Sequence, residues 1–211
     1  YDDLESIIYL LKNVTEIDLS GYSKSSLKRR IERFLQVEKM DVVDLKNAIV
    51  NVKDFHNYFI QELVVNVTEM FRDPQFYVSL KKNVIPYLKT YPQIRIWSAG
   101  SSTGEEAYST TILLNEMGIL ERSFIYGTDI SPRALEIARK GVYSLNKIKS
   151  YTENYLQTKP FTDFSSHYTA MYDAAIINKE YRSKVLFSTH NLVSDGAFNE
   201  FQLIMCRNVM I

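Results

Sequence analysis

The sequence has 211 residues, of which 45% are hydrophobic, and its 25 basic residues balance its 25 acidic residues. This composition suits one large or two small globular domains, and the neutral net charge gives no reason to expect a nucleic-acid or membrane-surface partner. A single cysteine excludes an internal disulfide framework and a cysteine-based zinc site, and no apolar run approaches the roughly 18 residues of a membrane span, so we expect a cytoplasmic protein without a metal.

The N-terminal third has the periodicity of helices. Apolar residues recur at positions i, i+3, i+4 and i+7 from Leu4 to Leu11. The same spacing predicts further helices at about 23–39, 41–51 and 54–64. We therefore expect a helical domain over residues 1–63.

The helix expected at 23–39 is strongly basic. Arg29, Arg30 and Arg33 fall on the side opposite its apolar stripe when successive residues turn by about 100°. A basic helix face is most often a solvated surface. Nucleic-acid binding is a weaker interpretation, because no aromatic residues interleave with these bases.

The most informative stretch runs from Ile94 to Ser109. Alternating apolar residues end in a turn with two glycines, Gly100 and Gly104, and a helix-forming segment follows. This order is typical of the opening of a βαβ unit in a parallel sheet, where ligands bind beyond the carboxyl ends of the strands. The glycines lack the G-x-G-x-x-G spacing of a dinucleotide site, so we expect no bound pyrophosphate.

Two carboxylates, Glu105 and Glu106, follow the glycine turn at once. They would repel a phosphate, and they fit a ligand with a positive group such as an ammonium. The alternative is that they only complement the helix dipole, with a capping hydroxyl from Thr103. The local sequence leaves both interpretations open.

A second strand is expected at 124–130 and carries Asp129 near its carboxyl end. An acid at this place binds ribose hydroxyls in nucleoside-binding sheets, although it also serves as a helix cap. Ser131 and Pro132 then begin a helix that Gly141 ends. A nucleoside site without a phosphate site, but with a place for an ammonium, describes S-adenosylmethionine.

The remaining elements are less clear from pattern. We expect a helix at about 144–158, and a region rich in Tyr, Phe, Thr and Ser at about 160–184 with a β-like patch from Ala174 to Ile177. A strand follows at 185–192, and the apolar run 201–206 predicts a strand buried on both faces.

The last of these strands would deliver Arg207 and Asn208 to the rim that holds Gly100 and Asp129. We expect Cys206 to pack in the core rather than act as a nucleophile, because the sequence places no base beside it.

Four segments resemble the signatures of one family, the CheR-type chemotaxis receptor methyltransferases. They are Asn66–Asp73, Trp97–Glu106, Thr128–Ile130 and Cys206–Ile211. They occur in the family's order, and the resemblance covers the chain from about residue 20 to its last residue. Ser101 stands where the family usually has Cys and Ala107 where it usually has Pro, but neither side chain is one that the family uses to hold its cofactor.

The resemblance implies an α/β fold with an all-helical N-terminal domain. Residues 1–63 would form this receptor-docking domain, and residues 64–90 a linker and first helix that close over the cofactor. Residues 91–211 would form a Rossmann-like class I methyltransferase domain with a small antiparallel β insertion at about 160–184. Only part of the family's sheet can be placed, so we expect the domain to be incomplete, with its C-terminal strands missing from this chain.

The resemblance also implies the residues of the site. Glu105 would hold the methionine ammonium, Asp129 the ribose, and Arg72 a carboxylate of the cofactor or the substrate. The basic helix would dock on acidic receptor helices through Arg29, Arg30 and Arg33. The full set of implied cofactor contacts is Asn66, Thr68, Arg72, Gly100, Glu105, Asp129, Asn191, Leu192, Arg207 and Asn208, with Asn191 and Leu192 at the adenine end.

The implied reaction is methyl transfer from S-adenosylmethionine to glutamate side chains of chemoreceptors, with S-adenosylhomocysteine as the product. The acceptor glutamate, with a reference pKa of about 4.3, is already ionised at neutral pH. We therefore expect residues that position the substrate and the cofactor, and no catalytic base. We expect a monomer that binds cytoplasmic receptor helices. We expect it to bind no metal and no nucleic acid, and not to insert into the bilayer.

Two other functions stay open. One is a CheR-like scaffold that binds the cofactor with little or no turnover, and the other is a methyltransferase for another acidic protein or a small molecule. The sequence also leaves open whether the β insertion holds a receptor's C-terminal peptide as an added strand.

Overall fold

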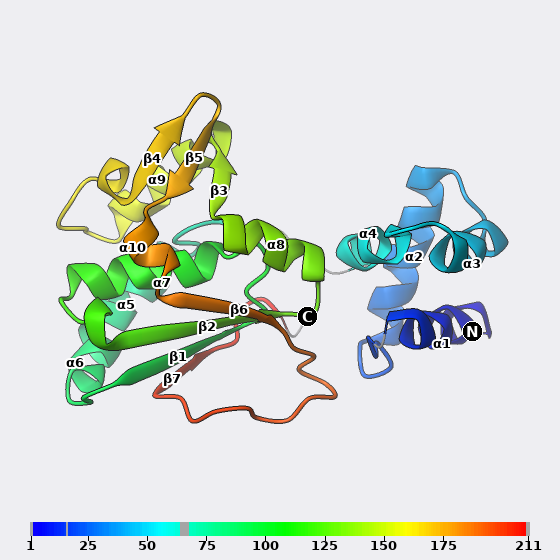
Figure 1. Ribbon diagram of the computed structural model, residues 1–211, viewed down its shortest axis with the longest axis horizontal. Helices are drawn as coiled ribbons and strands as arrows, with labels where there is room; N and C mark the ends of the chain where they lie inside the picture. Colours follow the sequence, from blue (N-terminus) through cyan, green and yellow to red (C-terminus); the bar gives the residue numbers. More distant parts are fainter. Residues whose placement is uncertain (1, 16, 64–67, 210–211) are drawn as a thin grey trace.

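The computed structural model describes residues 2–15, 17–63 and 68–209. They form a helical part and an α/β part that are distinct in Figure 1. The implied contacts at Asn66 and the rest of the 64–67 connection lie outside the described residues. No helix in the described ranges has both the length and the apolar character needed to cross a membrane.

The helical part confirms the helices expected from the N-terminal periodicity. Its core gathers the apolar stripes of these helices, and the Phe34 and Phe59 rings pack with centroids 4.8 Å apart. Asp41 and Asp44 form a capping box that begins the third helix. The helices are α1 (Asp2–Thr15), α2 (Lys24–Glu38), α3 (Val42–Asn51) and α4 (Phe55–Leu63).

The α/β part alternates strands and helices after a helical lead-in, as expected. The lead-in comprises α5 (Pro74–Ser79), a π-helical turn (Leu80–Val84) and α6 (Ile85–Leu88). The elements that follow are β1 (Ile94–Ala99), α7 (Glu105–Glu116), β2 (Ser123–Asp129), α8 (Pro132–Lys140), β3 (Val142–Ser144), α9 (Leu145–Gln157), β4 (Tyr168–Met171), β5 (Ala174–Ile177), α10 (Lys179–Arg182), β6 (Val185–Thr189) and β7 (Leu203–Met205).

The main sheet is parallel and has the strand order β6-β2-β1-β7. Helices α7 and α8 cover one face of it (Figure 1). On the other face, Phe198 and Phe201 from the segment between β6 and β7 pack against Trp97 and Tyr126. The carboxyl ends of β1, β2 and β7 meet at one edge, because parallel strands all run the same way.

The prediction of a last strand over 201–206 buried on both faces was wrong. Only Leu203–Met205 is a strand, and Met205 faces the helices while Ile204 is 55% exposed. Side chains alternate across a strand, and on this far face Phe124 and Leu186 are exposed as well. For the same reason Cys206 is exposed rather than packed in the core.

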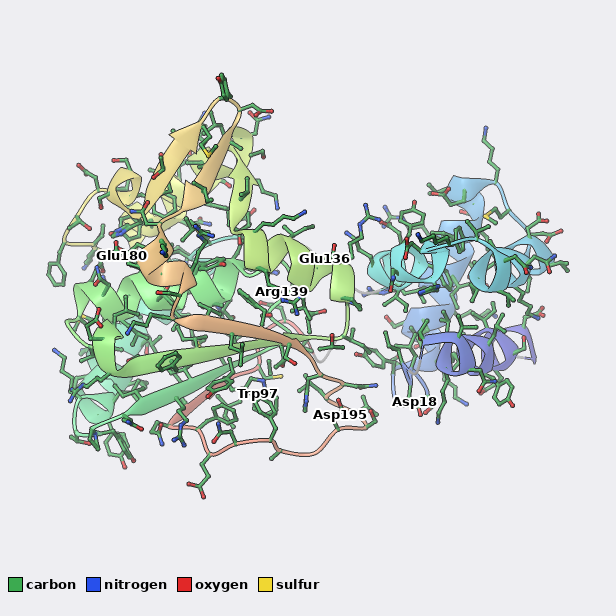
Figure 2. All side chains as sticks on the ribbon, in the orientation of Figure 1. Asp18, Trp97, Glu136, Arg139, Glu180 and Asp195 are labelled. Carbon is green, nitrogen blue, oxygen red and sulfur yellow. The ribbon has the colours of Figure 1, made fainter. Side chains whose placement is uncertain are left out.

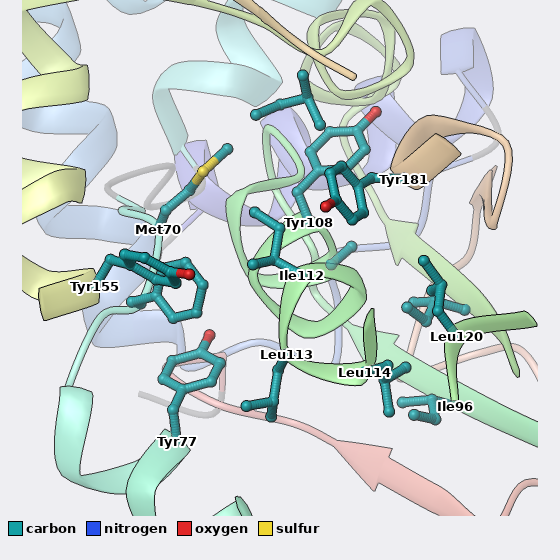
Figure 3. Close-up of a cluster of buried hydrophobic side chains, with 14 of the residues drawn as sticks. Met70, Tyr77, Ile96, Tyr108, Ile112, Leu113, Leu114, Leu120, Tyr155 and Tyr181 are labelled. Atoms are coloured by element: carbon teal, nitrogen blue, oxygen red, sulfur yellow. The ribbon is translucent and has the colours of Figure 1, made fainter. Parts of the chain in front are cut away.

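A second, antiparallel sheet with strand order β3-β5-β4 sits beside the main one. Its β3 precedes the helix α9, so the small sheet draws on residues before the expected 160–184 insertion. A dense cluster of buried side chains, many of them aromatic, joins this subdomain to the main sheet (Figure 3). In it Tyr155 of α9 packs on Phe71 at 4.9 Å between ring centroids.

Candidate functional site

Two cavities adjoin at the carboxyl end of β1. Both are lined by Gly100, Ser102 and Asn208, so they lie on either side of the turn that follows this strand. The first cavity encloses about 790 Å³ and the second about 420 Å³, their open mouths included.

The turn after β1 needs glycine at two positions because of its backbone conformation. Gly100 has a φ of +72°, and a Cβ there would lie 2.3 Å from the Val209 side chain. Gly104, with a φ of +94°, is the N-cap of α7 and has no side-chain cap. The Thr103 hydroxyl instead donates a 2.6 Å hydrogen bond to Glu105, so the Thr103 cap of the alternative interpretation is not formed.

Asp129 lines the first cavity at the end of β2. Its two carboxylate oxygens accept backbone N–H groups of Ser102 and Ser131 at 2.8 and 2.9 Å. Burial raises the pKa of Asp129, and the bonds from these amides oppose that rise. Each oxygen keeps a free acceptor direction for a hydroxyl of a ligand.

The rest of the first cavity comes from both parts of the molecule. The helical part supplies Tyr22, Ser26 and Arg30, while Leu192 and His190 line it from the segment after β6. His190 is held by its ring packing on Trp97, with the centroids 5.3 Å apart. Leu192 therefore lines the same cavity as Asp129.

Asn191 does not line either cavity among the described residues. Its amide donates to the Asp18 carbonyl at 2.7 Å, and its side-chain oxygen accepts the Val193 amide at 3.0 Å. Its backbone N–H donates to Asp195 at 2.8 Å. Asn191 thus shapes the segment that carries Leu192 and ties it to the helical part.

The second cavity is strongly charged. It is lined by Glu106 and Arg207, together with Thr68, Glu69 and Arg72 from the connection before α5. Glu106 accepts a hydrogen bond from Ser98 at 2.7 Å and pairs with Arg207 at 3.3 Å. Burial raises the pKa of Glu106, and Ser98 and Arg207 partly offset the rise.

Arg207 organises this cavity from the end of β7. Its guanidinium pairs with Asp73 at 2.8 Å and donates to the Arg72 carbonyl at 3.0 Å. It also lies over the Phe76 ring, 4.0 Å from the centroid. The connection before α5 and the end of β7, far apart in sequence, are thereby held together.

Glu105, the acid expected to hold an ammonium, lines neither described cavity and is fully buried. Its carboxylate accepts a hydrogen bond from Tyr151 at 2.9 Å and pairs with Lys147 at 3.3 Å. The carboxylate that faces the second cavity is its neighbour Glu106. The sequence identified this acidic pair but could not tell which acid faces the cavity, because both stand in the same helical turn.

The three arginines assigned to partner binding lie in different surroundings. Arg29 and Arg33 are exposed on α2. Arg30 instead turns toward the first cavity and donates to the Leu63 carbonyl at 2.8 Å. Tyr22 and Tyr77 line the cavities without having been predicted, because no local pattern distinguishes them, whereas Arg30 was predicted only as a partner-binding residue.

The charges along the two cavities fit one kind of ligand. Asp129 offers acceptors to a pair of hydroxyls, while Glu106, Arg72 and Arg207 offer a place for an ammonium and a carboxylate. A diphosphate across Gly100 would face two carboxylates. The described residues contain no group of three or more His, Cys, Asp or Glu side chains able to hold a metal ion.

Both parts of the chain match a known family. Residues 2–63 match the family described as "CheR methyltransferase, all-alpha domain", and residues 66–211 match "CheR methyltransferase, SAM binding domain". The two matches follow the division into a helical and an α/β part.

Individual relatives show the same similarity. The chain is 43% identical over 195 residues to a Pseudomonas putida protein named Cher3, which covers 92% of this chain and 71% of that protein. It is 28% identical over 214 residues to a chemotaxis protein methyltransferase of Listeria innocua, covering 96% and 75% of the two chains. A Salmonella typhimurium protein of the same name is 32% identical over 159 residues, 72% of this chain and 52% of that one.

Proposed function

Because the chain belongs to the CheR methyltransferase family, we propose that it methylates glutamate side chains of chemoreceptors with S-adenosylmethionine. It would act as a protein-glutamate O-methyltransferase and release S-adenosylhomocysteine. The observation that carries this proposal is the pair of adjoining cavities, which present Asp129 at one end and Glu106 with two arginines at the other.

The residues of the cavities fit the cofactor from end to end. Asp129 would accept both ribose hydroxyls, and Leu192 would pack against the adenine end. Glu106 would pair with the ammonium, in place of the neighbouring Glu105, and Arg72 or Arg207 with the carboxylate. Gly100 keeps the turn open, since a Cβ there would already be only 2.3 Å from Val209 before any ligand entered.

When bound, S-adenosylmethionine supplies an electrophilic methyl group on a sulfonium. The chain's residues would hold the acceptor carboxylate in line with it and exclude water. A glutamate is ionised at neutral pH, so no general base is needed. The rate would then come mainly from orientation, which is worth up to about 7–11 kcal/mol in well-aligned reactions.

Arg29 and Arg33 support docking on an acidic partner. Both are exposed on α2, beside the Arg30 that reaches the first cavity. A glutamate-bearing receptor helix laid along this basic face would come close to the cavity mouth. Reversing both charges (Arg29→Glu with Arg33→Glu) should abolish receptor methylation but leave S-adenosylhomocysteine affinity unchanged, whereas reversal of the remote pair Lys89 and Lys140 should change neither.

Two measurements test the function. Calorimetric titration should show that the protein binds S-adenosylhomocysteine. Asp129→Asn should weaken this binding at least about tenfold, because the hydrogen bonds from the ribose hydroxyls to a charged carboxylate are lost. Mass spectrometry of a chemoreceptor's cytoplasmic fragment, incubated with the protein and isotope-labelled cofactor, should show methylated glutamates. Failure to bind would overturn the assignment, and binding without methylation of any receptor tested would leave a scaffold or a methyltransferase for another substrate.

A further inference from the structure

The Tyr77 hydroxyl is buried against the second cavity without a hydrogen-bond partner. Tyr77 is fully buried on α5, where its ring packs on Phe71 and Phe76 at 5.0 and 5.2 Å between centroids. Its Oη makes no hydrogen bond with any residue that the structure describes. Figure 3 shows this oxygen directed away from the helix that carries it. A buried hydroxyl without a partner costs its full desolvation free energy, so native proteins seldom keep one without a use.

The groups around this hydroxyl are already committed elsewhere. Ser109 donates to the Glu105 carbonyl at 2.7 Å and accepts the Phe71 amide at 2.9 Å. Arg207 pairs with Glu106 and Asp73. The open direction at Tyr77 is therefore the cavity that it lines together with Glu106 and Arg207.

The phenol is suited to donate rather than to ionise. Burial raises the pKa of Tyr77, the charge of Glu106 raises it further, and Arg207 and Ser109 offset only part of the rise, so the hydroxyl stays protonated at neutral pH. A neutral phenol in a cavity that Arg72 and Arg207 also line sits where a ligand carboxylate would be attracted. The ammonium of the same ligand has Glu106 as its partner.

We propose that Tyr77 is a ligand-contact residue whose hydroxyl donates a hydrogen bond to the carboxylate of the cofactor's amino-acid part. This inference rests on the proposed function. It makes Tyr77 a specificity residue, because the hydroxyl contributes only to ligands that carry this amino-acid end. A phenylalanine would fill the same space, but the ligand carboxylate would lose one hydrogen-bond donor.

The test compares two ligands that differ in this end alone. S-adenosylhomocysteine carries the amino-acid part, and 5′-methylthioadenosine lacks it. Calorimetric titration of Tyr77→Phe should show S-adenosylhomocysteine bound about tenfold to a hundredfold more weakly than by the parent protein, the usual effect of losing a hydrogen bond to a charged group. The affinity for 5′-methylthioadenosine should stay within about twofold.

Two controls separate the loss of a ligand contact from a change in the stability of the fold. Tyr87→Phe removes the hydroxyl of a tyrosine that is 64% exposed on α6 and should change neither affinity. The ligand-free melting temperature of Tyr77→Phe should equal or exceed that of the parent protein, because the variant removes an unpaired buried hydroxyl.

Unchanged S-adenosylhomocysteine affinity, or an equal loss for both ligands, would overturn the role of Tyr77 and leave the proposed function standing. If the parent protein bound neither ligand, the proposed function would fail and this inference with it.

Discussion

Glu105 and Glu106 are neighbours in the chain but lie in different environments. Glu105 is enclosed by Tyr151, Lys147 and Thr103, whereas Glu106 faces the second cavity beside Arg207. At the scale of the residue, the first acid therefore holds the glycine turn to α9, and the second is available to a ligand.

Glutamine substitutions should separate these two roles. Glu106→Gln should weaken S-adenosylhomocysteine binding about tenfold or more, because it removes the charge opposite the ammonium. Glu105→Gln should lower the free energy of unfolding by about 1–3 kcal/mol, since the buried pairing is lost, and should change affinity much less. Calorimetry and thermal melts measure the two effects, and a larger affinity loss in Glu105→Gln would reverse our assignment.

Cofactor affinity should also depend on pH through Glu106. Burial raises its pKa above the usual 4.5, so protonation begins at a higher pH than for an exposed glutamate. The protonated acid cannot pair with an ammonium, so affinity should fall as the pH falls through the raised pKa. Calorimetry from about pH 8 to about pH 5 checks this, and Glu106→Gln should flatten that part of the profile.

The raised pKa of Glu106 affects the stability of the fold in the opposite direction to its effect on cofactor affinity. A raised native pKa means that the native state binds the proton more tightly than the unfolded chain does. The contribution of Glu106 to stability is therefore fully present below the unfolded pKa and is lost as the pH rises through the native one. Asp129 shifts in the same direction, also through burial. Mild acid should thus weaken ligand binding, while the contribution of these two groups to the stability of the fold increases.

At the scale of the element, α9 holds both walls of the second cavity. Lys147 and Tyr151 bind Glu105 beside the glycine turn. One helical turn further on, Asn154 donates to the Glu69 carboxylate and to the Met70 carbonyl, both at 3.1 Å. These positions share one helix face because they are three or four residues apart.

Asn154→Ala should loosen the connection that carries Thr68, Glu69 and Arg72. We expect the KM for the cofactor to rise about threefold to tenfold with a smaller change in kcat, because two hydrogen bonds that position the cavity wall are lost. Gln157→Ala, at an exposed position on the same helix that bonds only locally, is the matched control. Equal kinetics in the two variants would remove α9 from this role.

At the scale of the whole molecule, the helical part closes the first cavity. Ile130 at the end of β2 packs into the helical core, Gly21 lies against Val193, and Asn191 donates to the Asp18 carbonyl. Figure 2 shows Asp18 and Asp195 on the facing segments of the two parts. A ligand in this cavity would contact both parts at once.

Ligand binding should therefore stabilise both parts together. At about 100 times the Kd, S-adenosylhomocysteine should add about 2.7 kcal/mol to the free energy of unfolding. Hydrogen exchange should slow in the first turns of α2 as well as at residues 98–104. Protection confined to the α/β part would show that the helical part does not form a wall of the bound site.

The sequence by itself determined the helices of the N-terminal part and the order of the first strands and helices that follow, with the rim at their ends. Periods of 3.6 and 2 residues, the N-cap at Ser131, the stop at Gly141 and the strand ending in Asp129 are local properties, and the structure has them all. The acidic pair after the glycine turn was also found from the sequence, because its position next to the turn is a local property. The resemblance to the family added the connection before α5 to the site.

Only the tertiary structure decided which side chains face the cavities. Glu105 and Glu106 point about 100° apart around the helix axis, and the packing of α9 selects which of them is buried. The exposure of Cys206 and Ile204 depends on what covers the far face of the sheet, which no local pattern reports. Tyr22, Arg30 and Tyr77 reach the cavities through contacts between segments distant in sequence, and such contacts exist only once the chain has folded.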